Sequence, residues 1–300
     1  MNNTINFSKF FKLANIFSII TIVVSILFLF FKGLNYGVDF KGGTLLEIRV
    51  SDYNIKIQDI RNSLRIADLG DVSVKQFGKK GDFLVKFEKN SNENERFISE
   101  LKNNISGKIG SEINFRRVES VGPKVSSELL KQGITAIGLS LAAMLFYIWI
   151  RFEWQFSLGS IIALFHDVII TLGIFSILSL EVNLSIVAAV LTIVGYSMND
   201  TVVIYDRIRE NLLKYSKINT NEIANISVNE TLSRTIITSL TTLLALGSIF
   251  ILGGEILKGF SFAMILGVII GTYSSIFVAS PVLKYFRVTQ KTLLKEENLN

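Results

Sequence analysis

The chain has 300 residues with a formal net charge of +6, and 49% of its residues are hydrophobic. It contains no cysteine and a single histidine, His166, which excludes disulfides, thiolate chemistry and a metal centre built from several histidines. Charged residues concentrate between positions 37 and 132, so the rest of the chain is too apolar for an ordinary soluble domain. The composition therefore indicates a polytopic membrane protein with one polar segment.

The apolar runs predict six spanning helices, since a span needs roughly 20 mostly apolar residues. The predicted spans are 13–31, 134–150, 156–180, 182–205, 235–254 and 259–283. Only the third and fourth contain ionisable residues, which are His166 and Asp167 in one and Asp200 in the other. We expect the first span to be an uncleaved anchor, because no small-residue cleavage pattern follows it.

The basic residues predict that both termini are cytoplasmic, because cytoplasmic segments of membrane proteins carry an excess of lysine and arginine. The cytoplasmic segments are then the tail 1–12, the connection 206–234 and the tail 284–300, together with the turn at Arg151. Their basic residues are Lys9, Lys12, Arg151, Arg207, Arg209, Lys214, Lys217, Lys284, Arg287, Lys291 and Lys295. The two short connections on the other side hold only Lys258, and segment 32–133 lies outside, in a bacterial periplasm.

The outer segment predicts a small α+β domain. Strand patterns occupy 43–50, 71–77, 81–88 and 110–118, and helical patterns occupy 54–67 and 92–105. The order β-α-β-β-α-β is that of a ferredoxin-like split unit. Its charges are mixed in sign, so nothing indicates nucleic-acid binding. A folding or docking module and a direct substrate-binding module both fit this pattern.

Two short linkers flank this domain. The first, GVDFKGG at 37–43, contains Gly37, Asp39, Gly42 and Gly43, and the second contains Gly122 and Pro123. Such glycines predict tight turns and close backbone approach. A strand rather than a helix follows the first linker, and the chain contains no Gly-Lys-Ser/Thr sequence, which argues against a nucleotide site and ATP hydrolysis.

Asp200 and Arg234 are the strongest candidates for chemistry inside the membrane. A charged residue at mid-membrane costs at least about 2.5–3.5 kcal/mol, so it normally faces a bundle interior. The two residues lie near the cytoplasmic end of the fourth span and the start of the fifth, at comparable depth. We predict proton movement through Asp200 with Arg234 as modulator; the alternative is a static ion pair that joins two helices.

His166 and Asp167 lie near the middle of the third span. Adjacent helical positions point about 100° apart, so we expect no direct contact, although both side chains fit a proton relay with a third group. A histidine that is hydrogen-bonded between packed helices is an equally open interpretation, and a hydrolase that uses His166 is a further one. In the last span, Gly267 and Gly271 have the spacing that permits close helix approach.

Several segments together resemble the SecD/SecF family of bacterial protein-export membrane proteins, over nearly the whole chain. They are GVDFKGG at 37–43, VGPKVSSEL at 121–129, RFEWQFSLG at 151–159, HDVIITLG at 166–173, VAAVLTIVGYSMNDTVVIYDRIREN at 187–211, SRTIITSLTTLL at 233–244, GGEILKGF at 253–260 and GTYSSIFVASP at 271–281. Each motif alone is weakly specific, whereas the set is highly specific.

The resemblance implies a fold and a function. The fold is one six-span half of the resistance-nodulation-division (RND) type, with a periplasmic ferredoxin-like domain, in the bacterial inner membrane. The implied function is non-enzymatic: with a SecD half, the proton or sodium gradient drives movement and release of exported proteins, without a cofactor. Asp200 and Arg234 match the family's ion path, and we expect the two linkers to transmit the change to the periplasmic domain.

The resemblance also implies partners. These are SecD, the SecYEG channel, YajC and YidC as further candidates, and an unfolded secretory protein as substrate; no nucleic acid is expected. A small-molecule efflux half-transporter of the same superfamily and a passive scaffold of the channel are the alternatives. The sequence leaves open whether the coupling ion is H⁺ or Na⁺.

Overall fold

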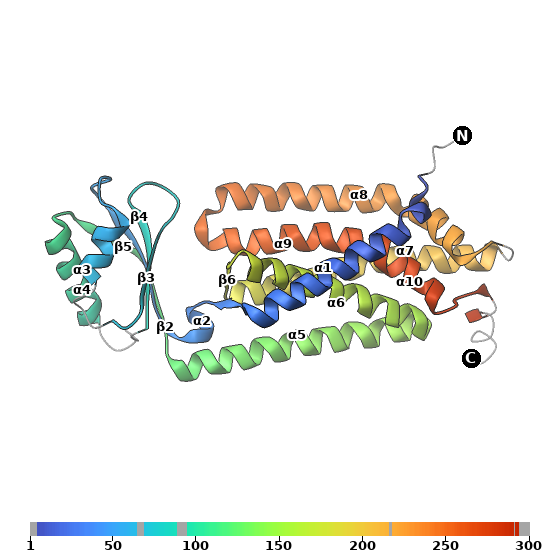
Figure 1. The fold of residues 1–300 in the computed structure, drawn as a ribbon, viewed down its shortest axis with the longest axis horizontal. Coiled ribbons are helices and arrows are strands. Elements are labelled where there is room, and N and C mark those ends of the chain that lie inside the picture. Colours follow the sequence, from blue (N-terminus) through green and yellow to red (C-terminus); the bar gives the residue numbers. More distant parts are fainter. Residues whose placement is uncertain (1–4, 65–68, 89–94, 216–217, 291, 294–300) are drawn as a thin grey trace. The chain divides into compact units, whose positions relative to one another are not determined.

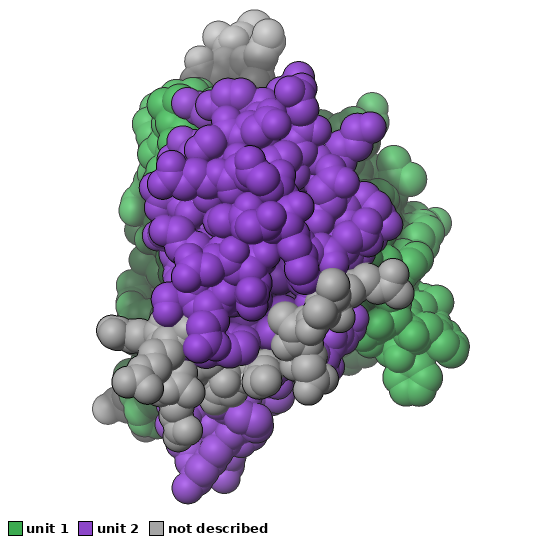
Figure 2. Space-filling view, turned by 90° about the vertical axis from the view of Figure 1, so that its left-hand side faces the viewer, with its two compact units in different colours: residues 1–35, 135–181, 185–300 green, residues 36–134, 182–184 purple. Residues whose placement is uncertain are grey.

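The computed structural model describes residues 5–64, 69–88, 95–215, 218–290 and 292–293. These residues form two compact units (Figure 2). The helical unit comprises the described residues within Met1–Asn35, Thr135–Glu181 and Ser185–Asn300. The sheet unit comprises those within Tyr36–Ile134 and Val182–Leu184.

Six described helices are long and apolar enough to cross a membrane, as the sequence predicts. They are α1 (Phe11–Phe31), α5 (Pro123–Arg151), α6 (Trp154–Ile177), α7 (Leu184–Lys214), α8 (Thr220–Leu252), and a last span in which α9 (Gly254–Ser274) continues through the π-helical η2 (Ser275–Ala279) into α10 (Ser280–Tyr285). A short 3₁₀ turn, η1 (Phe7–Lys9), precedes α1. The order of these helices along the chain can be followed in Figure 1.

Three helices extend beyond the predicted spans. α5 begins at Pro123 rather than near 134, α7 continues to Lys214, and α8 begins at Thr220. The predicted connection 206–234 is therefore largely helical, with 216–217 outside the described residues. Hydropathy marks where a chain leaves the hydrocarbon core, but a helix ends only where its caps lie. Asn219 supplies one such cap, because its side chain accepts a hydrogen bond from the Glu222 amide at 3.0 Å.

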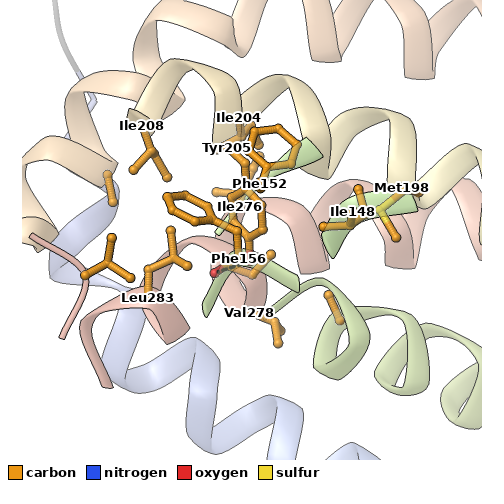
Figure 3. Packing of buried hydrophobic residues seen from close by; sticks show 14 of the residues in the cluster. Ile148, Phe152, Phe156, Met198, Ile204, Tyr205, Ile208, Ile276, Val278 and Leu283 are labelled. Carbon is orange, nitrogen blue, oxygen red and sulfur yellow. Dashed lines mark hydrogen bonds between the residues drawn. The ribbon is translucent and has the colours of Figure 1, made fainter. Parts of the chain in front are cut away.

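The core of the helical unit lies between α6, α7 and the last span. Phe156 and Tyr205 are fully buried there, beside Phe152 and Leu283 (Figure 3). Glycines allow close helix approach, as predicted for α9. A Cβ added at Gly267 would overlap Ile193 of α7, and a Cβ added at Gly271 would overlap Ser197 of α7. The two contact positions are about one helical turn apart on each helix.

The sheet unit has the predicted ferredoxin-like topology. Its elements are α2 (Val38–Lys41), β2 (Gly43–Val50), α3 (Ile57–Leu64), β3 (Val72–Gln76), β4 (Asp82–Phe87), α4 (Glu95–Ile109) and β5 (Ile113–Val121). The strands form one antiparallel sheet in the order β3-β4-β2-β5. The last strand has nine residues, as predicted, but it is displaced by three residues from the predicted 110–118 and ends at Val121, which pairs with Gly43. Parts of the predicted helices at 65–67 and 92–94 lie outside the described residues.

One face of this sheet is apolar because side chains alternate along each strand. Ile48 of β2 and Val85 of β4 pack against Ile60 of α3 and Ile105 of α4. All four are 0% exposed. A separate two-stranded pairing joins β1 (Asn35–Tyr36) to β6 (Glu181–Val182).

Candidate functional site

Asp200 lies in α7 and Arg234 in α8, and the structure does not join them in a direct ion pair. Asp200 is 4% exposed, and its Oδ2 is buried without a hydrogen-bond partner. Arg234 is exposed. Among the described residues, the ion pairs within 4.0 Å do not include these two side chains, although the charge of Arg234 acts on the Asp200 carboxylate. The alternative of a static ion pair is therefore not formed here.

Hydroxyl groups line the helices next to Asp200. Thr201 Oγ1 shares a hydrogen bond with Ser275 Oγ at 2.9 Å, which joins α7 to η2. Ser239 Oγ shares another with Thr272 Oγ1 at 2.7 Å, which joins α8 to α9. These side chains form the polar interior that the threonines and serines of both spans predict.

His166 and Asp167 are 1% and 0% exposed in the middle of α6. The expectation that the two side chains stay apart is wrong, because His166 Nδ1 lies 2.8 Å from Asp167 Oδ1. The helical spacing fixes only the directions of the Cα–Cβ bonds, and rotation about χ1 and χ2 brings the imidazole back toward its neighbour. His166 Nε2 is buried without a partner, and its ring stacks on that of Tyr273, with 6.0 Å between centroids.

Asp167 also joins three helices through its second carboxylate oxygen. Ser197 of α7 donates to Asp167 Oδ2 at 2.5 Å, and Ser274 of α9 donates to the same atom at 2.8 Å. Ser197 precedes Asp200 by three residues, so the network reaches the α7 face that carries Asp200. These serines are the third group that a relay from His166 and Asp167 would need.

The last span changes its hydrogen-bond pattern beside this network. Residues Ser275–Ala279 form a π-helix, a rare conformation that is frequent at functional sites. Ser280 Oγ donates to Ser275 O at 2.8 Å. Ser274 and Ser275 were not among the residues predicted from the sequence. The available signal was a pair of consecutive serines in a span that contains no charged residue.

The first linker makes the tight turns that its glycines predict. Gly37 is the N-cap residue of α2, which contains Asp39, and Gly42 and Gly43 then adopt φ values of 80° and 112°. A Cβ at Gly43 would lie 2.5 Å from Phe87 O, so no larger residue fits without displacing β4.

The second linker lies beside the first. A Cβ at Gly42 would lie 3.3 Å from Val121 O and 3.5 Å from Pro123 Cα. Pro123 opens α5, where its missing amide proton is tolerated, and the Ser126 amide donates to Gly122 O at 3.0 Å. The two linkers therefore meet through their backbones.

Asp39 connects the first linker to a spanning helix. Its Oδ2 accepts a hydrogen bond from the amide of Leu184, the first residue of α7, at 2.9 Å. A carboxylate is well placed there, because the first amides of a helix lack partners and its N-terminus carries partial positive charge. Leu184 begins the helix that also carries Asp200.

Sequence comparisons agree with this architecture. The pattern of the family "Protein export membrane protein SecD/SecF, C-terminal" matches residues 101–289, and that of the "SecD/SecF GG Motif" matches residues 27–52, which include the first linker. The chain is 45% identical over 282 residues to the protein translocase subunit SecF of Rickettsia rickettsii, covering 94% of this chain and 91% of the relative. It is 44% identical to that of Rickettsia typhi over 287 residues, covering 95% and 93%.

Structure comparisons lead to the same family. SecDF, a translocon-associated membrane protein from Thermus thermophilus, matches with a TM-score of 0.86 and 34% identity over 95% of this chain. SecDF in a super-membrane-facing form matches with a TM-score of 0.71 and 33% identity over the whole chain. The chain spans 39% and 41% of those SecDF chains.

These findings define a multi-pass membrane protein of the bacterial inner membrane with a small extramembrane α+β domain. The chain belongs to the SecD/SecF family of protein-export membrane proteins. Its function is accordingly that of an accessory subunit in protein export by the Sec translocase.

Proposed function

We propose that this chain, paired with a SecD half, uses the proton or sodium gradient to promote movement and release of exported proteins. The N- and C-termini lie in the cytoplasm and the sheet unit lies in the periplasm. SecYEG, with YajC and YidC as further partners, is the assembly on which the pair acts. SecDF of Thermus thermophilus is a translocon-associated membrane protein, and this chain matches only 39% of its length, which supports a SecD partner for this chain.

The observation that carries the proposal is the unpartnered carboxylate oxygen of Asp200. Burial in the membrane makes a permanent, unpaired charge expensive, so such a group alternates readily between a neutral and an ionised form. Among the described residues, Arg234 forms no ion pair with it within 4.0 Å, so the arginine does not neutralise this carboxylate permanently. A carboxylate in these surroundings can bind a cation from one side and release it to the other.

The linkers offer a route from this event to the sheet unit. Binding at Asp200 alters the packing of α7, whose first amide is held by Asp39. Asp39 lies in the linker that leads directly into β2. His166 and Asp167 remain a proposed relay, because Ser197 connects them to the same face of α7.

Export by variants in cells depleted of this subunit tests the proposal. Asp200→Asn and Arg234→Met should each reach normal membrane levels yet fail to restore export of a reporter precursor. Asp206→Asn is the matched control, since this exposed aspartate on the same helix pairs with Arg151 at 2.8 Å. A surface pair contributes about 0–1 kcal/mol, so the control should export normally.

Full export by both Asp200→Asn and Arg234→Met would contradict the proposal and would leave the chain a passive scaffold. The coupling ion is identified separately, by measuring wild-type export while external Na⁺ and the pH gradient are varied independently. If export depends on the pH gradient and not on Na⁺, the coupling ion is H⁺, and the opposite result assigns Na⁺.

A further inference from the structure

A further buried carboxylate lies at the turn between α5 and α6. Glu153 is 8% exposed, and its Oε1 lies 3.2 Å from Arg209 Nε of α7. Its Oε2 is buried without a hydrogen-bond partner, and so is Oε1 of Gln155, which is 6% exposed. Buried polar atoms normally have hydrogen-bond partners, so these two unpartnered oxygens indicate a small polar site that can bind and release a proton or another small ligand.

The site contacts the helix of Asp200 through Arg209 and lies nearer the proposed cytoplasmic side. Arg209 follows Asp200 by nine residues, a rise of about 13 Å along α7. The guanidinium side chain is 37% exposed, so it reaches from Glu153 to water. Glu153 therefore lies between the buried interior and the solvent.

An aromatic side chain of α7, between Asp200 and Arg209 in sequence, packs against two aromatic rings that flank Glu153. The ring of Tyr205 lies 5.1 Å from that of Phe156 and 6.4 Å from that of Phe152, measured between centroids (Figure 3). Tyr205 is 0% exposed, and its hydroxyl donates to the carbonyl of Ala279, the last residue of the π-helix, at 3.0 Å. We call Phe152, Phe156 and Tyr205 the aromatic layer.

We propose that Glu153 is the proton acceptor on the cytoplasmic side of the ion path and that the aromatic layer separates it from Asp200. The inference rests on the proposed function. A proton that leaves the Asp200 carboxyl binds Glu153 Oε2, and a later deprotonation releases it to water beside Arg209. The guanidinium contacts Oε1 at 3.2 Å, and Oε2 has no partner, so Oε2 is the atom that takes up the proton.

The charged and titratable groups around Glu153 agree with this role. From α7 they are Arg209 and Tyr205, together with Asp206, which is already paired with Arg151 of α5. Lys284 of α10 is exposed. Glu153 thus has one cationic partner at ion-pair distance among the described residues, and this partner leaves its Oε2 without a contact.

Inner-membrane vesicles of inverted orientation test the inference, because the surrounding medium then contacts the cytoplasmic face. Full-length Glu153→Gln and Glu153→Asp are produced with the SecD partner, and proton efflux is followed at medium pH values between about 6 and 9. We expect Glu153→Gln to lose about a hundredfold in flux, as for removal of a proton-transfer group. Glu153→Asp should retain flux with its dependence on medium pH displaced. Glu210→Gln is the control, since Glu210 is 65% exposed and paired with Arg207.

The outcomes separate this inference from the proposed function. If Glu153→Gln keeps wild-type flux while Asp200→Asn abolishes it, the inference is wrong and the proposed function stands. If Asp200→Asn also keeps its flux, both are wrong. Should Glu153→Gln fail to accumulate in the membrane, Glu153→Asp decides alone: a displaced pH profile supports the inference, and an unchanged profile overturns it.

Discussion

Asp167 and Asp200 are both buried in the helical unit, yet their surroundings differ. Asp167 accepts hydrogen bonds from Ser197 and Ser274 and contacts His166, so each of its oxygens has a partner. Asp200 keeps one oxygen without any. Asp167 therefore joins three helices through hydrogen bonds, whereas Asp200 keeps an oxygen open at the proposed ion site.

The acid dependence of the sheet unit should depend on Asp82. Its carboxylate, 3% exposed, accepts two hydrogen bonds from Arg49 at 2.5 Å, and this guanidinium lowers the pKa of Asp82 below its usual value. A lowered pKa in the folded state stabilises the fold above the unfolded value of about 3.9, and this stabilisation is lost as the pH falls through the folded value.

Hydrogen exchange of β4 in full-length Asp82→Asn and wild type measures this effect, since their ratio at each pH cancels the intrinsic pH dependence of exchange. We expect faster exchange in the variant above about pH 4 and convergence of the two rates in stronger acid. A ratio that stays constant with pH would show that the ion pair adds no pH-dependent stability.

The candidate residues of the site could be chosen from the sequence, but their contacts could not. An isolated aspartate or arginine in an apolar run is visible in one dimension, which is why Asp200 and Arg234 were found. The bond between His166 and Asp167 depends on side-chain rotamers, and the bonds from Ser197 and Ser274 depend on the relative registers of three helices. None of these follows from spacing within one helix.

At the scale of elements, α7 links the first linker to the intramembrane site. Asp39→Ala should remove the acceptor for the Leu184 amide and destabilise the start of α7 by about 1 kcal/mol, as expected for loss of a capping residue. Hydrogen exchange should accelerate in the first turn of α7 and stay unchanged in α8. Asp71→Ala is the control, because Asp71 is exposed. Equal exchange rates in the first turn of α7 in both variants would contradict the role of Asp39 in connecting the first linker to α7.

Close packing of α9 on α7 gives a second prediction. Gly271→Ala places a Cβ 2.9 Å from that of Ser197 and 3.3 Å from its Cα, so the two helices must separate. Such overpacking typically costs about 1–3 kcal/mol. Thermal unfolding of the purified protein should therefore occur at lower temperature, and export should fall.

Gly247→Ala is the matched control for this change. A Cβ at Gly247 meets no atom within 4 Å, and alanine is favoured over glycine in a helix by about 1 kcal/mol. The control should unfold at the same or a higher temperature. A similar loss in both variants would mean that general helix effects, rather than contact with Ser197, explain the result.

The elements themselves were largely predictable, because apolar runs of bilayer length and strands of period two are strong signals. Two features were not. The polar ends of α7 and α8 resemble a connection in hydropathy, although α7 continues to Lys214 and α8 already begins after the cap at Asn219. The π-helix at Ser275–Ala279 has no local sequence signal, since its hydrogen bonds are selected by packing against neighbouring helices.

At the scale of the whole molecule, burial of the helices is uneven. In their most apolar windows, α6 and the last span are each 56% buried and α7 is 50% buried, whereas α1 and α8 are 17% and α5 is 6% buried. The first three form the interior of the helical unit. The other three helices leave most of these windows exposed.

The proposed orientation can be tested directly, because the chain contains no cysteine. Asp71→Cys in the sheet unit should react with a membrane-impermeant maleimide in intact spheroplasts. Lys214→Cys, at the end of α7, should react only after the membrane is permeabilised. Both positions are exposed, so failure to react reflects sidedness rather than burial. The reverse labelling pattern would contradict the proposed topology.

The π-helix in the last span makes the number of residues in this segment important. A π-helical turn holds one residue more than an α-helical turn, so everything after Ala279 is rotated by about 100° relative to an uninterrupted helix. Deleting one residue from this segment would leave its composition nearly intact but turn Leu283 out of the core. Insertions and deletions should therefore be tolerated less here than substitutions, since the number of residues in this segment sets which side of the following helix faces the core.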